Sequence, residues 1–414
     1  MGSAAPLFPT MPPEFLPPWP PQINTLVVFG LVLWAGLVGG EIAHRSRYIP
    51  RITGYIAIGF LLGPSVLDVF TRPMVAGAGI FVDTALGLIL FQIGRRLHVP
   101  SLRNDRAVLL TALAECSISF AVVYLVLTAF SFPPVHAAIA AAIGISSSPA
   151  VVLLVMREFD AQGPVSDRAL TLIAVNNILA FFFFIAVLPW LHQTQEADWL
   201  TATLHPLYQV AGSLLLAYVL AHLTIRLGHL IGRRDSAQFA LLVGVIVLAV
   251  GTAQAFNVSL LLTLLALGIM CRNLDRREAL MEVEFGHGGD IFFVVLFVVA
   301  GANLHLGELA GAGLLAVAFV LARFAAKAGT VFVAGRLSGL SVAQAGGLGL
   351  TLTPMAAMAI GLLKTTEELY PGITPSLSAT VLAAIAILET VGPLAALWGL
   401  RLAGEVRPDA RLDH

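Results

Sequence analysis

The chain has 414 residues, of which 58% are hydrophobic and 11% are charged, and its mean hydropathy is +0.90. A soluble domain needs more polar surface than this, so the composition indicates an integral membrane protein. The formal net charge of −1 excludes the strongly basic surface with which proteins bind nucleic acid.

The first 23 residues are rich in proline and predict an irregular N-terminal arm. Long apolar runs follow, separated by short polar linkers. Lipid offers no partner to unpaired backbone amides, so runs of this length predict membrane-spanning helices within an all-helical domain at 24–402, followed by a short tail at 403–414. We place about thirteen of these helices, at 24–43, 52–69, 77–97, 107–129, 136–156, 169–191, 203–226, 237–254, 258–272, 288–303, 310–333, 342–364 and 377–402.

Arginines gather in the linkers after odd-numbered helices, for example Arg45, Arg96, Arg226 and Arg272, whereas the alternate linkers carry almost no basic residue. Cytoplasmic loops hold the excess of Lys and Arg in membrane proteins. We therefore expect a multi-pass protein of the cell inner (plasma) membrane, with its N-terminus outside and its C-terminus in the cytoplasm.

Two predicted helices carry a hydroxyl-rich stretch that contains a proline. These stretches are GISSSPAVV at 144–152 and GLTLTPMAAM at 349–358. Each proline removes an amide donor and frees a carbonyl in the preceding turn, and the two lie at corresponding places if the seventh helix links two inverted repeats of six. Interrupted helices in such a repeat mark a binding site at the bilayer midplane. The predicted site residues from these stretches are Ser147, Ser148, Pro149, Thr353 and Pro354.

Charged residues within the apolar runs are further candidates. Arg323 and Lys327 lie four residues apart and so share one face of a predicted helix. Burying each in lipid costs about 2.5–3.5 kcal/mol on insertion scales, so such residues are functional by default. Among the acidic residues in apolar runs, Glu389 is the strongest candidate because it lies in the middle of the last helix, whereas Glu115 is read as a residue near a helix end or a partner for an arginine.

The two cysteines, Cys116 and Cys271, lie in or at the end of apolar runs and form no paired motif. The histidines are scattered, and their spacing matches no metal site. We therefore expect no bound metal, cofactor or disulfide. The chain also has no protease or phosphate-binding motif, so we do not expect an enzyme.

Several segments along the chain carry a joint resemblance to one family. They are the early glycine-proline helix GYIAIGFLLGPSVLDVF, FQIG, GISSSPAVV with the loop after it, and the later FFVVLFVVAGANLHLGEL and ETVGPLAALWG. Together they resemble the monovalent cation:proton antiporter superfamily, in the branch that holds bacterial sodium/proton and potassium-efflux antiporters. The resemblance covers nearly the whole chain from about residue 25. It implies two crossed, interrupted helices, transport by alternating access, and a homodimer.

In that family an Asp-Asp or Asn-Asp pair follows the serine-rich helix and binds either a cation or a proton. The matching positions here are Asn176 and Asn177, which do not titrate. Lys327 matches the lysine that pairs with the family's aspartate, and on this basis it is expected to lack its acidic partner. Two further departures are Arg95-Arg96 and the stretch that follows Pro354.

Of three functions that these residues leave open, we expect the first, and the other two are its alternatives. The first is exchange of Na⁺ or K⁺ for a proton carried by Lys327, with the cation near the carbonyls of Asn176 and Asn177. The second is transport of an anion or another solute on the same fold, held by Arg323, Lys327, the amides, the positive half-helix ends and the hydroxyls. The third is a membrane sensor or partner protein that transports nothing.

Overall fold

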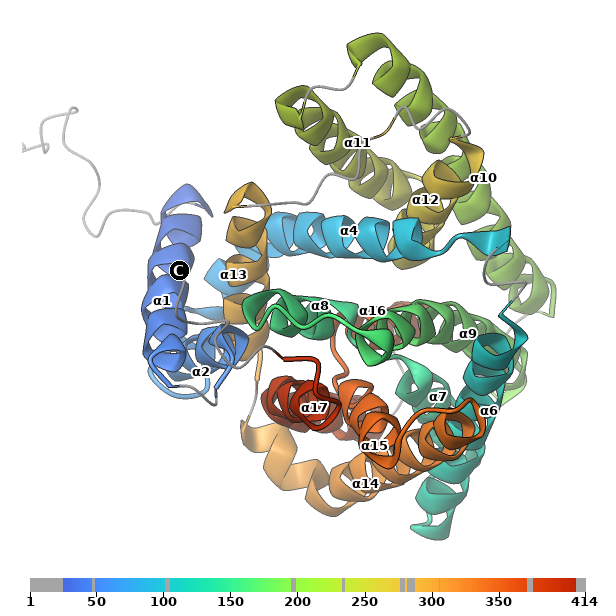
Figure 1. Cartoon of the computed structure of the whole chain (residues 1–414). Helices are drawn as coiled ribbons and strands as arrows, with labels where there is room; N and C mark the ends of the chain where they lie inside the picture. Colours follow the sequence, from blue (N-terminus) through green and yellow to red (C-terminus); the bar gives the residue numbers. More distant parts are fainter. Residues whose placement is uncertain are drawn as a thin grey trace, which may run out of the picture.

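The apolar runs form helices throughout the residues that the structure, a computed structural model, describes: 25–46, 49–100, 105–194, 199–232, 235–275, 280, 287–304, 306–370 and 375–406. The predicted arm at 1–23 and residues 407–414 of the predicted tail lie outside them. The helices (Figure 1) are α1 (Thr25–His44), α2 (Arg51–Leu62), α3 (Arg72–Gly77), α4 (Gly79–Arg96), α6 (Arg106–Ala129), α7 (Pro134–Ile145), α8 (Pro149–Glu158), α9 (Pro164–Thr194), α10 (Trp199–Ile231), α11 (Asp235–Ala255), α12 (Leu260–Leu274), α13 (His287–Ala302), α14 (Leu306–Leu337), α15 (Val342–Thr351), α16 (Ala357–Leu369) and α17 (Pro375–Leu402).

Within the described ranges, eight helices are long and apolar enough to cross a membrane, and Arg51–Leu62, Leu260–Leu274 and Ile291–Ala302 are shorter apolar helices. Each predicted segment overlaps a helix of the structure, which confirms the all-helical membrane class. The second segment is shorter than predicted, because α2 ends at Leu62. Gly63 is extended there, and a turn follows in which Asp68 has a φ of 51°.

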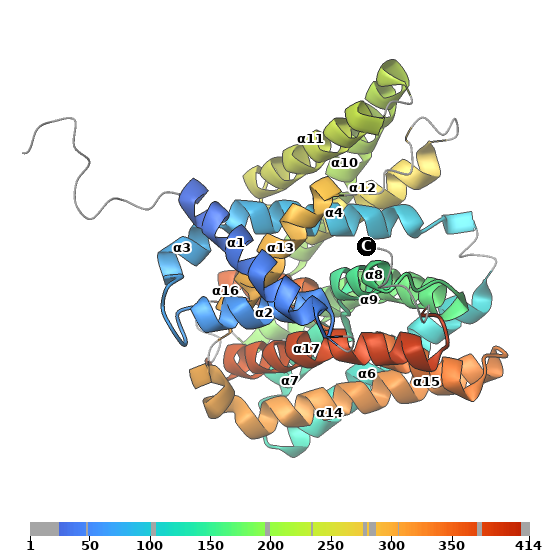
Figure 2. The same ribbon diagram turned by 60° about the vertical axis from the view of Figure 1, so that its left-hand side comes forward.

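The helices form two bundles that lie against each other (Figures 1 and 2). The crossing bundle consists of α6 to α9 and α14 to α17, and it holds both interrupted helices. The second bundle consists of α1, α2, α4 and α10 to α13. The two meet where α4 packs on α8 and α9, where α2 packs on α8 and α17, and where α10 packs on α9.

Glycines allow close helix packing inside the second bundle. A Cβ atom added to Gly94 of α4 would overlap the carbonyl oxygen of Leu265 in α12, and one added to Gly268 of α12 would overlap that of Phe91 in α4. Gly54 packs in the same way on Gly39 of α1. Small residues at a helix interface let the backbones approach closely, which stabilises packing where lipid removes the hydrophobic driving force.

The interrupted helix at the centre of the crossing bundle is the most enclosed of the long apolar segments. The apolar window of the span Pro134–Glu158 is 94% buried, whereas that of Leu207–Ile231 is 28% buried. Large hydrophobic side chains such as Trp34 and Leu230 are exposed on the peripheral helices, as expected for a surface in contact with lipid tails. Lipid therefore surrounds the peripheral helices, and the two helix breaks lie inside protein.

Candidate functional site

The two helix breaks contact each other. The first separates α7, which ends at Ile145, from α8, which begins at Pro149; the second separates α15 from α16. The amide of Ser148 donates to the carbonyl of Pro354 at 2.8 Å, and the hydroxyl of Ser147 donates to the carbonyl of Leu352 at 3.1 Å. Predicted site residues from both breaks are thus brought together at one crossing.

Arg323 of α14 fills the space between the two breaks. Its side chain is fully buried. The guanidinium donates from Nε to the carbonyl of Gly144 at 2.8 Å, from Nη1 to that of Thr353 at 2.7 Å, and from Nη2 to that of Ser146 at 2.7 Å. These carbonyls lie at the C-terminal ends of α7 and α15, where unpaired carbonyls carry a partial negative charge. The positive charge of Arg323 therefore compensates both helix ends.

Lys327, one turn further along α14, forms an ion pair with Glu115 of α6. The ammonium nitrogen lies 2.5 Å from Oε1 of Glu115, and both side chains are buried. The hydroxyl of Ser119 donates to the same carboxylate at 3.2 Å. The expectation that Lys327 lacks an acidic partner is therefore wrong: α6 supplies the carboxylate that the asparagines of α9 do not.

Glu115 is the residue that sequence reasoning missed. The sequence predicts a residue near a helix end or a partner for an arginine, but Glu115 lies well inside α6 (Arg106–Ala129) and its partner is Lys327. The sequence contains a signal for Glu115, namely a carboxylate within an apolar span. Such a carboxylate is as costly to insert into the membrane as Arg323 and Lys327 of α14, so the same argument predicts a function for it.

Asn176 and Asn177 of α9 connect the ion pair to the crossing. Asn176 Oδ1 accepts from the thiol of Cys116 at 3.3 Å, and Cys116 is the neighbour of Glu115 in α6. Asn177 Oδ1 accepts from the amide of Ser147 at 3.2 Å. Both asparagines are fully buried, and their Nδ2 atoms have no hydrogen-bond partner among the described residues. Each amide oxygen already binds one donor, while two buried donors are left unused.

A cavity of about 610 Å³ extends between the two bundles and reaches the crossing from one side. Its walls include the end of α11, the start of α12 and the C-terminal half of α9. We call the part next to the crossing, which is lined by Ser148, Ala356 and Glu389, the floor of the cavity. Glu389 belongs to α17 and is 2% exposed. Of the predicted site residues, Ser148 and Glu389 line the cavity, whereas the two asparagines, Arg323 and Lys327 do not.

Two aromatic residues of α9 line the cavity on the helix face that carries Asn177. They are Phe181 and Phe184, which follow Asn177 at four and seven residues. Asn177 itself is fully buried and does not line the cavity. Neither the asparagines nor the ion pair is therefore in contact with the cavity in this conformation.

The bundles are joined at the ends of their helices away from the cavity. The amide of Arg51, at the start of α2, donates to the carboxylate of Glu158 at the end of α8 at 2.8 Å. Nearby, the guanidinium of Arg157 donates to Gln92 of α4 at 3.5 Å. The crossing is thus approached by a cavity from one side and covered by contacts between the bundles on the other.

A family model described as sodium/hydrogen exchanger, transmembrane, matches residues 29–397. The chain belongs to this family. Its members are transporters and not enzymes, in agreement with the expectation from the sequence. No curated protein matches the chain at the level of sequence.

Solved structures of the sodium proton antiporter MjNhaP1 from Methanocaldococcus jannaschii share the fold. One, determined at pH 8, aligns with a TM-score of 0.68 and 16% identity over 92% of this chain and 99% of that one. A second, from electron microscopy, aligns with a TM-score of 0.65 and 17% identity over 92% and 98%. The exchanger fold of this chain therefore holds its two interrupted helices, with an asparagine pair and a lysine–glutamate pair beside their crossing.

Proposed function

We propose that the chain exchanges a monovalent cation, Na⁺ or K⁺, for a proton by alternating access, and that the Glu115–Lys327 pair performs the exchange. The observation that carries this proposal is the buried contact between the Lys327 ammonium and the Glu115 carboxylate, next to the asparagines. The pair brings a titratable acid–base couple to the place where the asparagines do not titrate.

The exchange follows from competition for one carboxylate. A cation that binds Glu115 displaces the ammonium of Lys327, which is then a buried charge without a partner. Such a charge is strongly unfavourable in a medium of low dielectric constant. Lys327 relieves it by breaking one N–H bond and releasing the proton to water, which leaves a neutral amine beside a cation–carboxylate pair. When the cation leaves, the amine takes up a proton and the ion pair re-forms.

Alternating access is supported by the asymmetry of the structure. The cavity leads to the crossing from one side, and hydrogen bonds between Arg51 and Glu158 and between Arg157 and Gln92 join the bundles on the other. If the crossing bundle moves against the second bundle, these contacts break and the cavity closes. The linker arginines predict a plasma-membrane protein with its N-terminus outside. In that orientation the cavity of this conformation opens to the outside. We also propose that the chain works as a homodimer.

Transport of an anion on the same fold has less support, because the two cations are engaged. All three nitrogens of the Arg323 guanidinium donate to backbone carbonyls, and Lys327 binds Glu115. An anion would have to displace bonds that compensate two helix ends. The features that favour an anion are the unused Nδ2 donors of the asparagines and the positive N-terminal ends of α8 and α16.

The test is proton movement in proteoliposomes that contain a pH-sensitive dye. A jump in external Na⁺ or K⁺ should move protons through the wild-type protein, and Glu115→Gln or Lys327→Gln should abolish the movement. Glu367→Gln is the matched control, because Glu367 is an exposed carboxylate of α16. If no cation moves protons through the wild type, exchange is excluded, and the anion transporter and the non-transporting sensor remain. If Lys327→Gln exchanges at the wild-type rate, the pair has no role.

A further inference from the structure

We infer that Glu389 of α17 is a cation-binding residue at the floor of the cavity, where it holds the cation before it reaches the Glu115–Lys327 pair. Its place in transport rests on the proposed function, whereas binding of the cation to Glu389 does not. The geometry that carries the inference is an unpaired, buried carboxylate that faces a cavity beside the crossing of the interrupted helices.

The carboxylate of Glu389 is enclosed and has no protein partner. The residue is 2% exposed, and among the residues that the structure describes no hydrogen bond or ion pair involves its side chain. A buried carboxylate without a partner is costly, so one that persists inside a membrane protein indicates a function. The side chain lines the cavity.

Asp83 of α4, another acidic residue of the cavity wall, is in a different state. Its carboxylate accepts a hydrogen bond from Gln254 of α11 at 2.8 Å, and the positive charge of Lys364 interacts with it. Asp83 is therefore compensated within the wall. Within the described ranges, Glu389 is the cavity carboxylate whose charge is left for a ligand.

The floor of the cavity needs a negative charge if a cation is to occupy it. Ser148 and Ala356 line the floor, and they directly precede the first residues of α8 and α16. Helix N-termini carry a partial positive charge, which repels cations. The carboxylate of Glu389 opposes this field and makes the floor suitable for a monovalent cation.

The face of α17 that carries Glu389 also contacts one of the two helix breaks. Gly392, three residues further along α17 and on the same face, packs against Pro354, so closely that an added Cβ would come within 2.9 Å of the Pro354 Cα. This contact holds the Glu389 side of α17 against the break between α15 and α16. A cation at Glu389 would thus lie beside the break between α15 and α16, which Arg323 and Ser148 contact.

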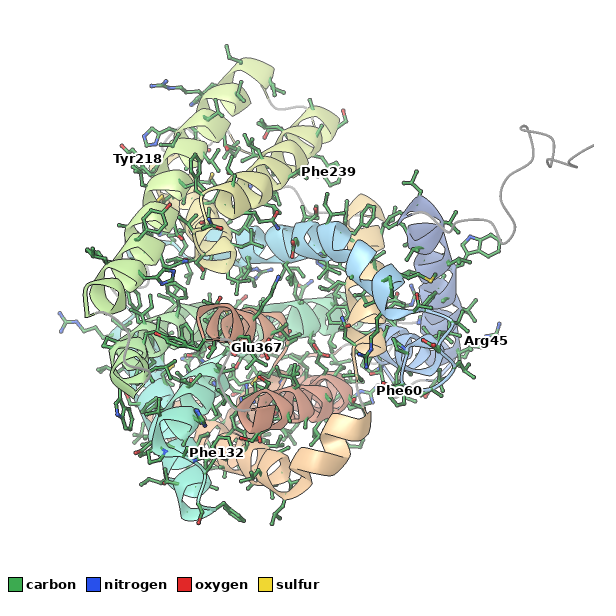
Figure 3. All side chains as sticks on the ribbon, turned by 180° about the vertical axis from the view of Figure 1, so that it is seen from behind. Arg45, Phe60, Phe132, Tyr218, Phe239 and Glu367 are labelled. Atoms are coloured by element: carbon green, nitrogen blue, oxygen red, sulfur yellow. The ribbon has the colours of Figure 1, made fainter. Side chains whose placement is uncertain are left out.

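Cation binding to the purified protein tests the inference without transport. Titration with Na⁺ or K⁺, with choline as the control for ionic strength, should raise the thermal midpoint of the wild type, because a ligand that binds the native state stabilises it by mass action. At a given cation concentration Glu389→Gln should lose most of the rise, Glu389→Asp should restore part of it, and Glu367→Gln should behave like the wild type. Glu367, near the end of α16, is exposed and is labelled in Figure 3.

The baseline stability separates binding from a structural role. Glu389→Gln replaces a buried carboxyl group without a partner by a neutral amide of similar size, so without cation it should be as stable as the wild type or more stable. A large loss of baseline stability would indicate a structural contact and would overturn the inference. So would equal cation stabilisation of Glu389→Gln and Glu367→Gln, or the absence of any cation effect on the wild type.

Transport kinetics distinguish this inference from the proposed function. Glu389→Gln should raise the cation KM about tenfold or more, which corresponds to about 1.4 kcal/mol of binding free energy, whereas Glu115→Gln should abolish exchange. If Glu389→Gln has the KM of the wild type while Glu115→Gln is inactive, the Glu389 site fails and the proposed function stands. If cations stabilise the wild type through Glu389 but drive no proton movement, the site stands and the proposed function fails.

Discussion

Arg323 occupies the place at which interrupted helices in transporters commonly present carbonyls to a transported cation. Here a side chain provides that positive charge permanently, because the guanidinium binds the carbonyls of Gly144, Ser146 and Thr353. On the proposed mechanism a mobile cation therefore binds elsewhere, at the carboxylates of Glu115 and Glu389. Arg323 is on this account a positioning residue that holds the two breaks together.

Arg323→Gln should strongly destabilise the protein. The change leaves buried carbonyls at the ends of α7 and α15 without donors, at about 1–3 kcal/mol for each unsatisfied group. The thermal midpoint in detergent should fall far more than for Arg226→Gln, which changes an exposed arginine of α10. Arg323→Lys should lie between the two, because it keeps the charge but loses the planar fork of donors. Equal midpoints for Arg323→Gln and Arg226→Gln would contradict this role.

At the level of single residues, the sequence predicted positions better than partners. Arg323 and Lys327 could be selected because charge in an apolar run is costly, and the same argument applies to Glu115. The partner of Lys327 could not be derived, since Glu115 lies 212 residues away in the chain and helix spacing pairs only residues within a turn or two. The resemblance directed attention to α9, whereas the carboxylate comes from α6.

At the level of elements, the helix breaks were predictable because proline has a local effect. Pro149 and Pro354 each remove an amide donor next to a hydroxyl-rich stretch, and the structure interrupts both helices beside them. Pro189 and Pro393, which have no such stretch, lie inside continuous helices. The contact between the breaks followed from the expected repeat and is confirmed by the bond between Ser148 and Pro354. The cavity could not be predicted, since its lining residues come from nine helices whose packing no local pattern specifies.

The close packing of α4 on α12 gives a prediction for glycine substitutions. Gly268→Ala should destabilise the protein by about 1–3 kcal/mol, because the added methyl group pushes α12 away from the backbone of α4. Gly251→Ala in α11 is the control, since an added Cβ there meets open space. Thermal unfolding in detergent should show a lower midpoint for Gly268→Ala and an unchanged or higher one for Gly251→Ala. The reverse order would mean that α4 and α12 are not in close contact.

At the level of the whole molecule, the two bundles have different roles. The crossing bundle holds the buried pair and both interrupted helices, and the second bundle supplies much of the cavity wall. On the proposed mechanism, one cation enters and one lysine proton leaves in each cycle. The net charge moved across the membrane is therefore zero. This is a property of the whole transport cycle and not of one residue.

Electroneutral exchange tests the central claim most directly. Proteoliposomes with an internal pH dye, adsorbed on a solid-supported membrane, report proton movement and charge movement in the same sample. A jump in Na⁺ or K⁺ should change the internal pH without a sustained current, and Lys327→Gln should abolish the pH change. A sustained current that accompanies the pH change, or a pH change that persists in Lys327→Gln, would contradict the exchange of one lysine proton for one cation.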